Sequence, residues 1–418
     1  MSDIATAVST RERSEIPDNV PADRIYNVDM YALDGIEEGY HEAWKRLQGP
    51  NIPEMIWTPY TGGHWIATRG ELIREIYLDP ERFSSEVIFL PKEAGEKYAM
   101  VPTRLDPPEH TPYRKVLAKG LNMGQVHRLE NLARTIAGDL IEGFSAKGEC
   151  NFPTDYAEIF PVKLFMALAG LPMEDAPMLG RWAQQMTRPA GESPEEMAAC
   201  LNEGNQNFFA YVEPLIEARR GKDGDDLIST MINSDIDNEM MPHDMALGLI
   251  SLLLLAGLDT VVNFLSYMML YLARNPDKVA QLLNEPRRQV TGVEELFRRF
   301  GVVSEGRMAA KDFEYYGVNL KRGDMILIPT ALHGLDETLN PDPWRVDFDR
   351  KDASHSLFGG GPHRCAGAHL ARMEVMVTLQ EWLKRIPEFG LKPGVAPAYH
   401  SGIVATVENL QLVWPRKA

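Results

Sequence analysis

The stretch from Met245 to Ala273 constrains the fold more than any other part of the chain, because Asp259 is its one charged residue. Fourteen uncharged residues precede that aspartate, fewer than the roughly 18 that a membrane-spanning helix needs. Thr260 and Asn263 then interrupt the apolar run, and such polar groups are costly within a bilayer. We therefore expect a helix that is buried in the core of a soluble protein, with other elements packed around it.

Helical patterns dominate the rest of the sequence. Proline and glycine positions delimit the expected helices, which are 107–120, 125–146, 154–170, 173–186, 195–220, 243–275, 276–284, 288–300 and 368–386. A Thr-Gly-Gly turn within residues 55–69 predicts a hairpin, and short strands are expected at 312–320 and 324–330. Strands and helices do not alternate as they would around a parallel sheet. The expected fold class is mainly α with a smaller β portion.

A single domain is expected to account for almost the whole chain. No linker rich in glycine, serine or proline divides the sequence. We expect a mobile N-terminal arm at residues 1–25 and one domain at 26–418. Its β-rich part would comprise about 50–105 and 303–335, and its helical part about 106–300 and 366–386.

The charge balance is strongly acidic, with 43 Lys+Arg against 60 Asp+Glu and a net charge of −17. Such a chain repels the phosphates of nucleic acids, so nucleic-acid binding is not expected. Three scattered cysteines do not make a disulfide framework, and the polar N-terminal segment lacks the apolar run of a signal peptide. These features favour a cytoplasmic protein.

A glycine-rich loop surrounds Cys365 in the sequence Phe358-Gly-Gly-Gly-Pro-His-Arg-Cys-Ala-Gly367, and a helix is expected after it. Glycines let such a loop lie close to a flat group, and a helix N-terminus favours a thiolate. These are the needs of a cysteine that is the single protein ligand of a metal. The alternatives are a buried free cysteine and, less favoured, a zinc site of His363, Cys365 and His369 that lacks a fourth ligand.

The cysteine loop and a second motif resemble those of the cytochrome P-450 family. The pattern F-x-x-G-x-x-x-C-x-G, filled by Phe358, Gly361, Cys365 and Gly367, is similar to the haem-binding loop of that family. The sequence Glu295-Leu-Phe-Arg298 is similar to the E-x-x-R motif of one of its helices. The resemblance covers essentially the whole chain after the N-terminal arm.

Two further motifs occur in the order that the family has them. Ala256-Gly257-Leu258-Asp259-Thr260 resembles the oxygen-activating motif of the family's long central helix. Pro107-Pro108-Glu109-His110, followed by Arg114, resembles the helix that reaches a haem propionate. The resemblance implies a cytochrome P-450 fold, with haem b between the central helix and the cysteine loop.

The resemblance assigns roles to these motifs. Cys365 would ligate the haem iron, and an axial thiolate favours cleavage of the O–O bond. Glu295 and Arg298 share a helix face and would form a structural network with Arg345; an exposed ion pair of little value is the alternative. The haem propionates would be held by basic residues from several segments: His110, Arg114, Arg307 and His363.

The acid and hydroxyl of the central helix are expected to be catalytic. Asp259 and Thr260 would deliver protons for dioxygen activation, whereas the alternative is a helix residue neutralised by a distant arginine. A carboxylate in an apolar helix is costly and so calls for a reason. Ala256 and Gly257 have almost no side chain and would let a flat ligand approach the helix closely.

Several segments are similar to bacterial members of the family that hydroxylate camphor; they are 26–31, 62–69, 83–86, 259–264 and 401–404. On this similarity Tyr98 would donate a hydrogen bond to a substrate ketone in an otherwise apolar pocket. The pocket walls would be Phe89, Thr103, Leu252, Leu255, Thr260 and Val303. A monovalent cation could bind near Glu86, Gly95, Glu96 and Tyr98.

The chain also departs from those camphor enzymes. Ala99 and Met100 change the expected pocket roof. Gly180 and Gln184 replace a lysine and an aspartate of the network that holds the central-helix acid, although Arg188 is kept. We therefore expect Asp259 to be freer to move, and proton delivery to depend less on release by a partner.

The implied activity is hydroxylation of camphor at carbon 5, with dioxygen and two electrons. The electrons would come from a [2Fe–2S] ferredoxin and an NADH-dependent flavoprotein reductase, and the enzyme would be a monomer. A basic docking surface is expected from Arg74, Arg114, Lys115, Lys119, Arg364 and Arg372; dispersed surface charge is the alternative.

Three rival functions remain open at the level of sequence. The same chemistry could act on another terpenoid, such as an ionone or a cineole. A peroxide-driven peroxygenase of the family would carry an arginine–proline pair where this chain has Asp259-Thr260. A haem gas sensor would need neither that pair nor an apolar substrate pocket.

Overall fold

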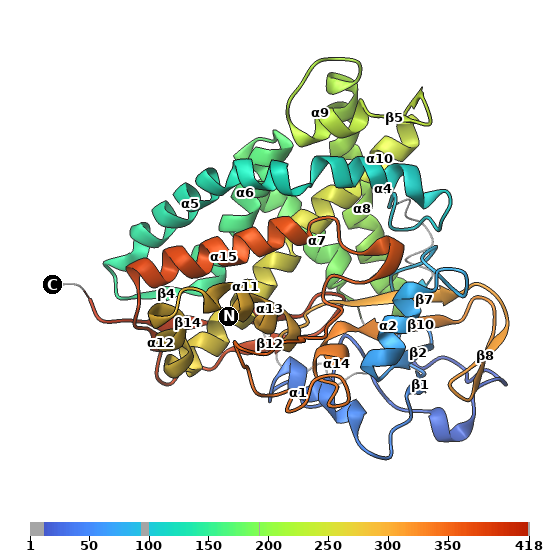
Figure 1. The fold of residues 1–418 in the computed structure, drawn as a ribbon. Helices are drawn as coiled ribbons and strands as arrows, with labels where there is room; N and C mark the ends of the chain where they lie inside the picture. Colours follow the sequence, from blue (N-terminus) through green and yellow to red (C-terminus); the bar gives the residue numbers. More distant parts are fainter. Residues whose placement is uncertain (1–11, 93–99, 192, 417–418) are drawn as a thin grey trace.

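The longer helices gather on one side of the molecule and the main sheet lies on the other (Figure 1). The computed structural model describes residues 12–92, 100–191 and 193–416. The longer helices are α4 (His110–Gly120), α5 (Met123–Ser145), α6 (Phe160–Ala169), α7 (Ala176–Thr187), α8 (Pro194–Arg219), α10 (His243–Leu258), α11 (Thr260–Arg274), α13 (Arg288–Arg299) and α15 (Ala368–Arg385). The expected class, mainly α with a smaller β portion, is confirmed.

Short helices join these longer ones. They are α1 (Tyr40–Lys45), α2 (Gly70–Leu78), α9 (Leu227–Ile232), α12 (Pro276–Asn284) and α14 (Thr330–Gly334), with the single turns η1 (Ala22–Arg24), η2 (Arg46–Gln48), η3 (Pro153–Ala157), η4 (Met173–Asp175) and η5 (Gly361–His363). Proline accounts for several of these starts, since its fixed φ suits a first helical turn. The helix expected at 276–284 is found with those limits, whereas the one expected from residue 107 begins at His110.

A five-stranded sheet has the strand order β1-β2-β10-β7-β3. Its strands are β1 (Met55–Thr58), β2 (His64–Ala67), β3 (Phe83–Ser84), β7 (Ser304–Ala309) and β10 (Met325–Pro329). The hairpin expected within 55–69 is confirmed, because β1 and β2 pair antiparallel with Met55 opposite Ala67. Strand β10 pairs parallel with β2 and antiparallel with β7, so the sheet joins segments far apart in the sequence.

The remaining strands form small sheets of two or three strands. They are β4 (Glu149–Asn151), β5 (Asp235–Ile236), β6 (Glu239–Met240), β8 (Phe313–Tyr315), β9 (Val318–Leu320), β11 (Gly390–Leu391), β12 (Ala398–His400), β13 (Thr406–Glu408) and β14 (Gln411–Val413). The pair β8–β9 confirms the strands expected at 312–320.

The expected central helix is interrupted at Asp259, where φ is −130° and ψ is −40°. The segment His243–Arg274 is long and apolar enough to cross a membrane by length and composition, but 61% of its most apolar window is buried inside the protein. Helix α10 packs against α6, α7 and α8. The segment is therefore a core helix that is interrupted at Asp259.

The N-terminal segment is attached to the sheet where the structure describes it. Ser14 donates a backbone hydrogen bond to Pro59 O (2.8 Å), and Ile25 forms a parallel bridge with Trp57. Asn19 donates to Asn319 O (2.8 Å). The mobile arm expected at 1–25 is thus corrected for residues 12–25, which pack on the sheet; residues 1–11 lie outside the described part.

Helix α15 connects the cysteine loop to the core. It packs along α5 and also contacts α13 and α11 (Figure 1). The loop that precedes it lies against α2, through η5. The chain around Cys365 is therefore placed between the helical part and the sheet-containing part.

Candidate functional site

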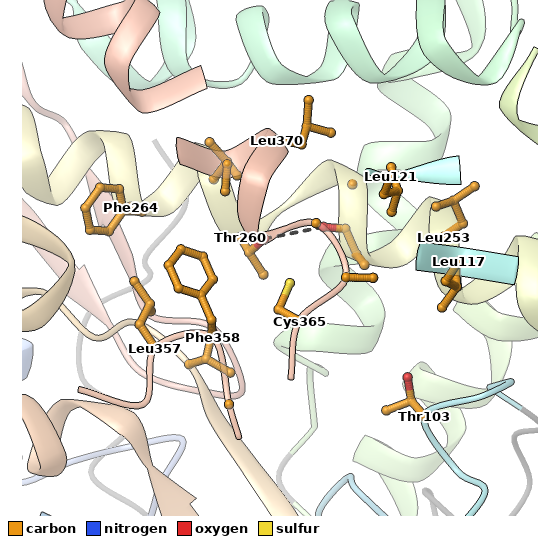
Figure 2. Close-up of a pocket in the computed structure, with 18 of the residues that line it drawn as sticks. Thr103, Leu117, Leu121, Leu253, Thr260, Phe264, Leu357, Phe358, Cys365 and Leu370 are labelled. Carbon is orange, nitrogen blue, oxygen red and sulfur yellow. Dashed lines mark hydrogen bonds between the residues drawn. The ribbon is translucent and has the colours of Figure 1, made fainter. Parts of the chain in front are cut away.

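A cavity of about 300 Å³ lies where α10, α11, α15 and the cysteine loop meet (Figure 2). Most of its lining is apolar, with side chains that include Leu117, Leu121, Leu253, Phe264, Leu357 and Leu370. The sulfur of Cys365 and the hydroxyl of Thr260 belong to the same cavity. A mostly apolar cavity with few polar groups is typical of a cofactor or small-molecule site.

The glycines of the cysteine loop are required by a close approach to α2. Gly361 has φ +58°, and a Cβ atom there would lie 2.4 Å from the carbonyl oxygen of Tyr77. Gly359 also has a positive φ, of +65°. The loop closes when Cys365 N donates to Phe358 O at 2.7 Å. Glycine is thus needed for both the backbone conformation and the contact.

The protein alone does not keep Cys365 as a thiolate. Burial raises the pKa of its thiol, although the backbone N–H of Gly367 and the charge of Arg114 lower it. A coordinated metal ion would deprotonate the thiol directly, so the thiolate depends on the metal.

Basic side chains gather at one end of the cavity, where Arg114 and His363 line it. The rings of His110 and His363 lie 4.3 Å apart between centroids, and the Nε2 atoms of both are buried without a hydrogen-bond partner among the described residues. Burial, with Arg307, His110 and Arg114 nearby, lowers the pKa of His363 to about 3. Burial likewise lowers the pKa of Arg114.

This donor set fits the carboxylates of a haem. Arg307 has an acidic neighbour, Glu305, at 3.3 Å, but the basic groups outnumber it. Two carboxylates placed here would accept hydrogen bonds from the guanidinium groups and from the orphaned imidazoles. Together with the nearby cysteine and the apolar lining, the residues fit a haem.

The small residues of the central helix have a different structural role from the one that we expected. Ala256 and Gly257 both line the cavity, but a Cβ at Gly257 would lie 2.5 Å from the ring of Phe165 on α6. Gly257 therefore allows close packing of α6. Thr260 Oγ1 donates to Ala256 O at 3.3 Å (Figure 2), so its hydroxyl is at present turned to its own helix.

Asp259 is held firmly, contrary to the expectation that it would be freer. Arg188 binds its two carboxylate oxygens at 2.9 and 3.1 Å, and Asn263 Nδ2 donates to Oδ1 at 3.0 Å. The side chain faces a second cavity, of about 480 Å³, which Gly180 and Gln184 also line. The two replacements thus leave space beside Asp259 without releasing it, because Arg188 alone makes a bidentate pair.

The E-x-x-R pair is buried, and its third member differs from the one expected. Arg298 Nε binds Glu295 Oε2 at 2.8 Å, and both side chains are at most 1% exposed. The side chain that completes the network is Arg350, with Nε 3.0 Å from Glu295 Oε2. Arg345 is 65% exposed and pairs with Asp347; it contributes its backbone oxygen to Arg298. The assignment of Arg345 is therefore wrong.

The expected substrate pocket is assembled in part. Thr103, Leu252, Thr260 and Val303 line the cavity. Phe89 and Leu255 are buried, with 4% and 7% exposure, but do not contribute to the lining formed by the described residues. Three expected residues lie outside the described part: Gly95, Glu96 and Tyr98. Of the residues expected at the cation site, Glu86 lies within the described part, and its carbonyl accepts a hydrogen bond from Arg104.

Not all six residues expected to form the basic docking surface are exposed and unpaired. Arg74 binds Glu71, and Arg372 binds Glu294. Arg114 lines the cavity and donates to Arg364 O. The basic residues of the set at the exposed surface are Arg74, which is paired with Glu71, and Lys115, Lys119 and Arg364.

Sequence reasoning missed one acidic residue of the cavity. Glu374 is 3% exposed and lines it, and burial raises its pKa to about 8. It lies four residues after Leu370 and seven after Gly367, so it falls on the helix face that carries the cavity-lining residues of α15. The signal in the sequence was an acidic residue on the apolar face of the helix expected at 368–386.

Comparison with known proteins agrees with this geometry. Residues 193–397 match the family model described as "Cytochrome P450". The "Probable cytochrome P450 127A1" of Sinorhizobium fredii is 31% identical over 407 residues, which cover 96% of this chain and 97% of that protein. The "Vitamin D(3) 25-hydroxylase" of Pseudonocardia autotrophica is 29% identical, over 85% of this chain and 88% of that protein.

Solved structures are similar over nearly the whole chain. CYP101J2 is 40% identical with a TM-score of 0.87, and CYP101C1 is 36% identical with a TM-score of 0.86. In both comparisons 96% of this chain and 100% of the other chain are covered.

Proposed function

The chain belongs to the cytochrome P450 family and is a haem-thiolate monooxygenase, and on this premise we propose that Cys365 ligates the iron and that the substrate is camphor or a closely related monoterpenoid ketone. The observation that carries the ligand assignment is the position of the Cys365 sulfur, which lines an apolar cavity together with Thr260 of the central helix and with Arg114 and His363 of the basic cluster. Cys150 is buried and is not among the residues that line this cavity.

The haem, when bound, supplies the iron at which dioxygen is reduced and a substrate C–H bond is hydroxylated. Arg114, Arg307 and His363 would hold the propionates, and the ring of His110 lies beside that of His363. Leucine and phenylalanine side chains exclude water, which strengthens the electrostatic interactions inside. The overall reaction converts substrate, dioxygen, two electrons and two protons into an alcohol and water.

Asp259 and Thr260 move the protons in this proposal. Thr260 can turn its hydroxyl from Ala256 O toward the cavity, because the two lie 3.3 Å apart in a weak contact. Asp259 stands at the break between α10 and α11, next to the second cavity. It must exchange its bonds to Arg188 before it carries a proton, so the ion pair limits its movement.

A substrate of limited size and low polarity is supported by the cavity walls. Leu252, Val303 and Thr103 offer apolar contact and one hydroxyl. In the proposal Tyr98 donates a hydrogen bond to the ketone, worth about 0.5–1.5 kcal/mol net. The similarity to CYP101J2 and CYP101C1 supports the same subgroup. Titration of the ferric haem spectrum with camphor, an ionone and a cineole tests the substrate class, and Tyr98→Phe should weaken binding of ketones but not of a terpene hydrocarbon that has no oxygen acceptor.

The proposed electron donor is a [2Fe–2S] ferredoxin, reduced by an NADH-dependent flavoprotein. Exposed Lys115, Lys119 and Arg364 support an acidic partner near the cysteine loop. We include in the proposal that the enzyme acts as a cytoplasmic monomer. Product formation with NADH, reductase and ferredoxin, compared with hydrogen peroxide alone, separates a monooxygenase from a peroxygenase.

The carbon-monoxide complex of the reduced protein tests the central assignment. We expect the red-shifted Soret band that a thiolate ligand produces, and its loss in Cys365→Ser. Cys150→Ser is the matched control, because Cys150 is a buried cysteine elsewhere in the fold, and it should keep the band. A normal thiolate spectrum in Cys365→Ser would overturn the assignment.

A further inference from the structure

A third cavity, of about 190 Å³, lies beside the turn between β1 and β2, on the sheet side of the molecule (Figure 1). Among the described residues, its lining has no member in common with the cavity of Cys365 or with the cavity beside Asp259. Glu15 and Pro17 line it and are exposed, so it is open to solvent on their side. A water molecule takes up about 30 Å³ in the liquid, so the cavity has room for a small organic molecule.

Two buried polar side chains line this cavity without a partner. His64, the first residue of β2, is 1% exposed, and its Nδ1 and Nε2 atoms make no hydrogen bond within the described residues. Thr61 is 3% exposed, and its Oγ1 atom makes none either. Both residues belong to the cavity lining. A buried polar group that stays unpaired is costly, so these atoms call for a hydrogen-bonding molecule in the cavity.

The backbone of Thr61 supports the same conclusion. Its φ is +55°, and Gly62 and Gly63 follow with φ of +83° and +73°. Gly63 N donates to Tyr60 O at 3.1 Å and closes the turn. Glycine adopts such angles without a steric cost, whereas a β-branched residue with positive φ is strained. Strain of this kind persists where a side chain has a use, and here the strained residue is also the one whose hydroxyl is unpaired.

The imidazole of His64 is neutral at pH 7. Burial lowers its pKa to about 3, and a weak contact with the backbone carbonyl of Tyr60, outside hydrogen-bond geometry, only partly opposes this shift. A neutral imidazole has one nitrogen that donates and one that accepts. A ligand hydroxyl also donates and accepts, so it can pair with one of these nitrogens and with the hydroxyl of Thr61 at the same time.

The charged side chains of the lining do not favour a charged ligand. Asp324 Oδ2 accepts a hydrogen bond from Trp65 Nε1 at 3.1 Å, and Lys92 Nζ donates to Gly323 O at 3.1 Å. Glu15 is exposed to solvent. A charged ligand would lose its water in this cavity without gaining an unpaired counter-charge, which is costly. We therefore expect an uncharged ligand.

Apolar side chains form much of the remaining wall. Trp57, Leu90 and Met325 line the cavity, and each is at most 3% exposed. A wall of this kind favours a ligand with a hydrocarbon body and few polar groups. A molecule that consists mainly of hydroxyl groups, such as glycerol, would gain little from these contacts.

We propose that this cavity binds a small uncharged alcohol with an apolar body, and that His64 and Thr61 hold its hydroxyl group. The site is separate from the cavity of Cys365, so both can be occupied at once. The product of the proposed reaction, a hydroxylated monoterpenoid, has this chemistry. Only this link to the product rests on the proposed function.

Nuclear magnetic resonance of the His64 ring tests the site in the haem-loaded enzyme. The probe is borneol, a monoterpenoid alcohol, which is added to the reduced carbon-monoxide complex with isotope-labelled histidine and with camphor present. We expect the ring resonances that are lost in His64→Gln to shift with borneol until they saturate, while the haem spectrum stays constant. Glycerol should cause no such shift.

Two results of this titration would overturn the proposal. If borneol caused no shift, water alone would fill the cavity. If the His64 shift always accompanied a change in the haem spectrum, borneol would be bound in the substrate cavity instead.

Variants at Thr61 separate ligand binding from stability. Thr61→Gly removes the hydroxyl and suits the φ of +55°, so it should melt at or above the wild-type temperature. It should nevertheless bind borneol about two- to tenfold more weakly, as expected for the loss of one neutral hydrogen bond. Thr61→Ser keeps the hydroxyl and should bind borneol as wild type does. Equal affinities in the glycine and serine variants would refute the role of the hydroxyl.

The carbon-monoxide spectrum keeps this proposal apart from the proposed function. Thr61 and His64 are not among the residues that line the cavity of Cys365, so their variants should keep the thiolate band. A normal band without a borneol shift refutes only the alcohol site. A wild-type protein without the band refutes the proposed function and leaves the His64 result standing.

Discussion

Replacement of Arg350 by alanine should destabilise the protein far more than the same replacement at Arg345. Both arginines follow the E-x-x-R helix in the same irregular segment, but only Arg350 reaches Glu295 with its side chain. Arg350 is 13% exposed and also donates to the carbonyl groups of Pro341 and Asp342. It therefore ties the segment to a buried carboxylate.

The expected loss of stability in Arg350→Ala depends on which interactions of Glu295 remain. A hydrogen bond to a charged group contributes about 1.5–3 kcal/mol, and Arg350 Nε contacts both oxygens of Glu295. Breaking a buried ion pair costs about 3–5 kcal/mol. Because Arg298 stays in place, Glu295 keeps one cationic partner. We therefore expect a loss of about 3 kcal/mol, at the lower end of that range. Arg345 is 65% exposed, and its pair with Asp347 is worth about 0–1 kcal/mol.

Urea unfolding of the haem-loaded proteins measures this difference. Far-ultraviolet circular dichroism follows the helices, and haem absorbance follows the cofactor. Arg350→Ala should shift both midpoints to lower urea and release haem earlier, whereas Arg345→Ala should stay close to wild type. If Arg345→Ala were the more damaging change, the observed network and the reasoning from it would be refuted.

Three other perturbations have defined outcomes. Thr260→Ala should bind haem and substrate as wild type does but divert electrons to peroxide, which product and peroxide yields per NADH will show; unchanged coupling contradicts its role. Gly361→Ala should lose haem on dialysis, because its Cβ would meet Tyr77 O at 2.4 Å, whereas Gly394→Ala, with positive φ but open space, should retain it. Although burial raises it, hydrogen bonds from His355 and Arg372 hold the pKa of Glu294 at about 2, below its usual 4.5. The pair therefore stabilises the fold above pH 4.5 and loses this effect as the pH falls toward 2, so the difference in melting temperature between wild type and Arg372→Gln should shrink over that interval.

The sequence by itself determined the features that depend on neighbouring residues. Proline positions set the limits of α12 to the residue, and the spacing of Glu295 and Arg298 placed them on one helix face. The glycines before Cys365 indicated a loop with unusual backbone angles. Such features follow from local sterics and helical periodicity, so a window of a few residues contains them.

Only the tertiary structure decided which distant side chains meet. Arg350 rather than Arg345 reaches Glu295 across more than fifty residues, and Arg188 holds Asp259 from the C-terminal end of α7. Both arginines lie in the same irregular segment, and their distance from Glu295 along the sequence does not show which of them binds it. Likewise, the burial that keeps Glu374 neutral comes from elements contributed by the whole chain. The choice is made by packing, because a charged pair forms where the surrounding backbone brings the two groups into reach and removes competing water.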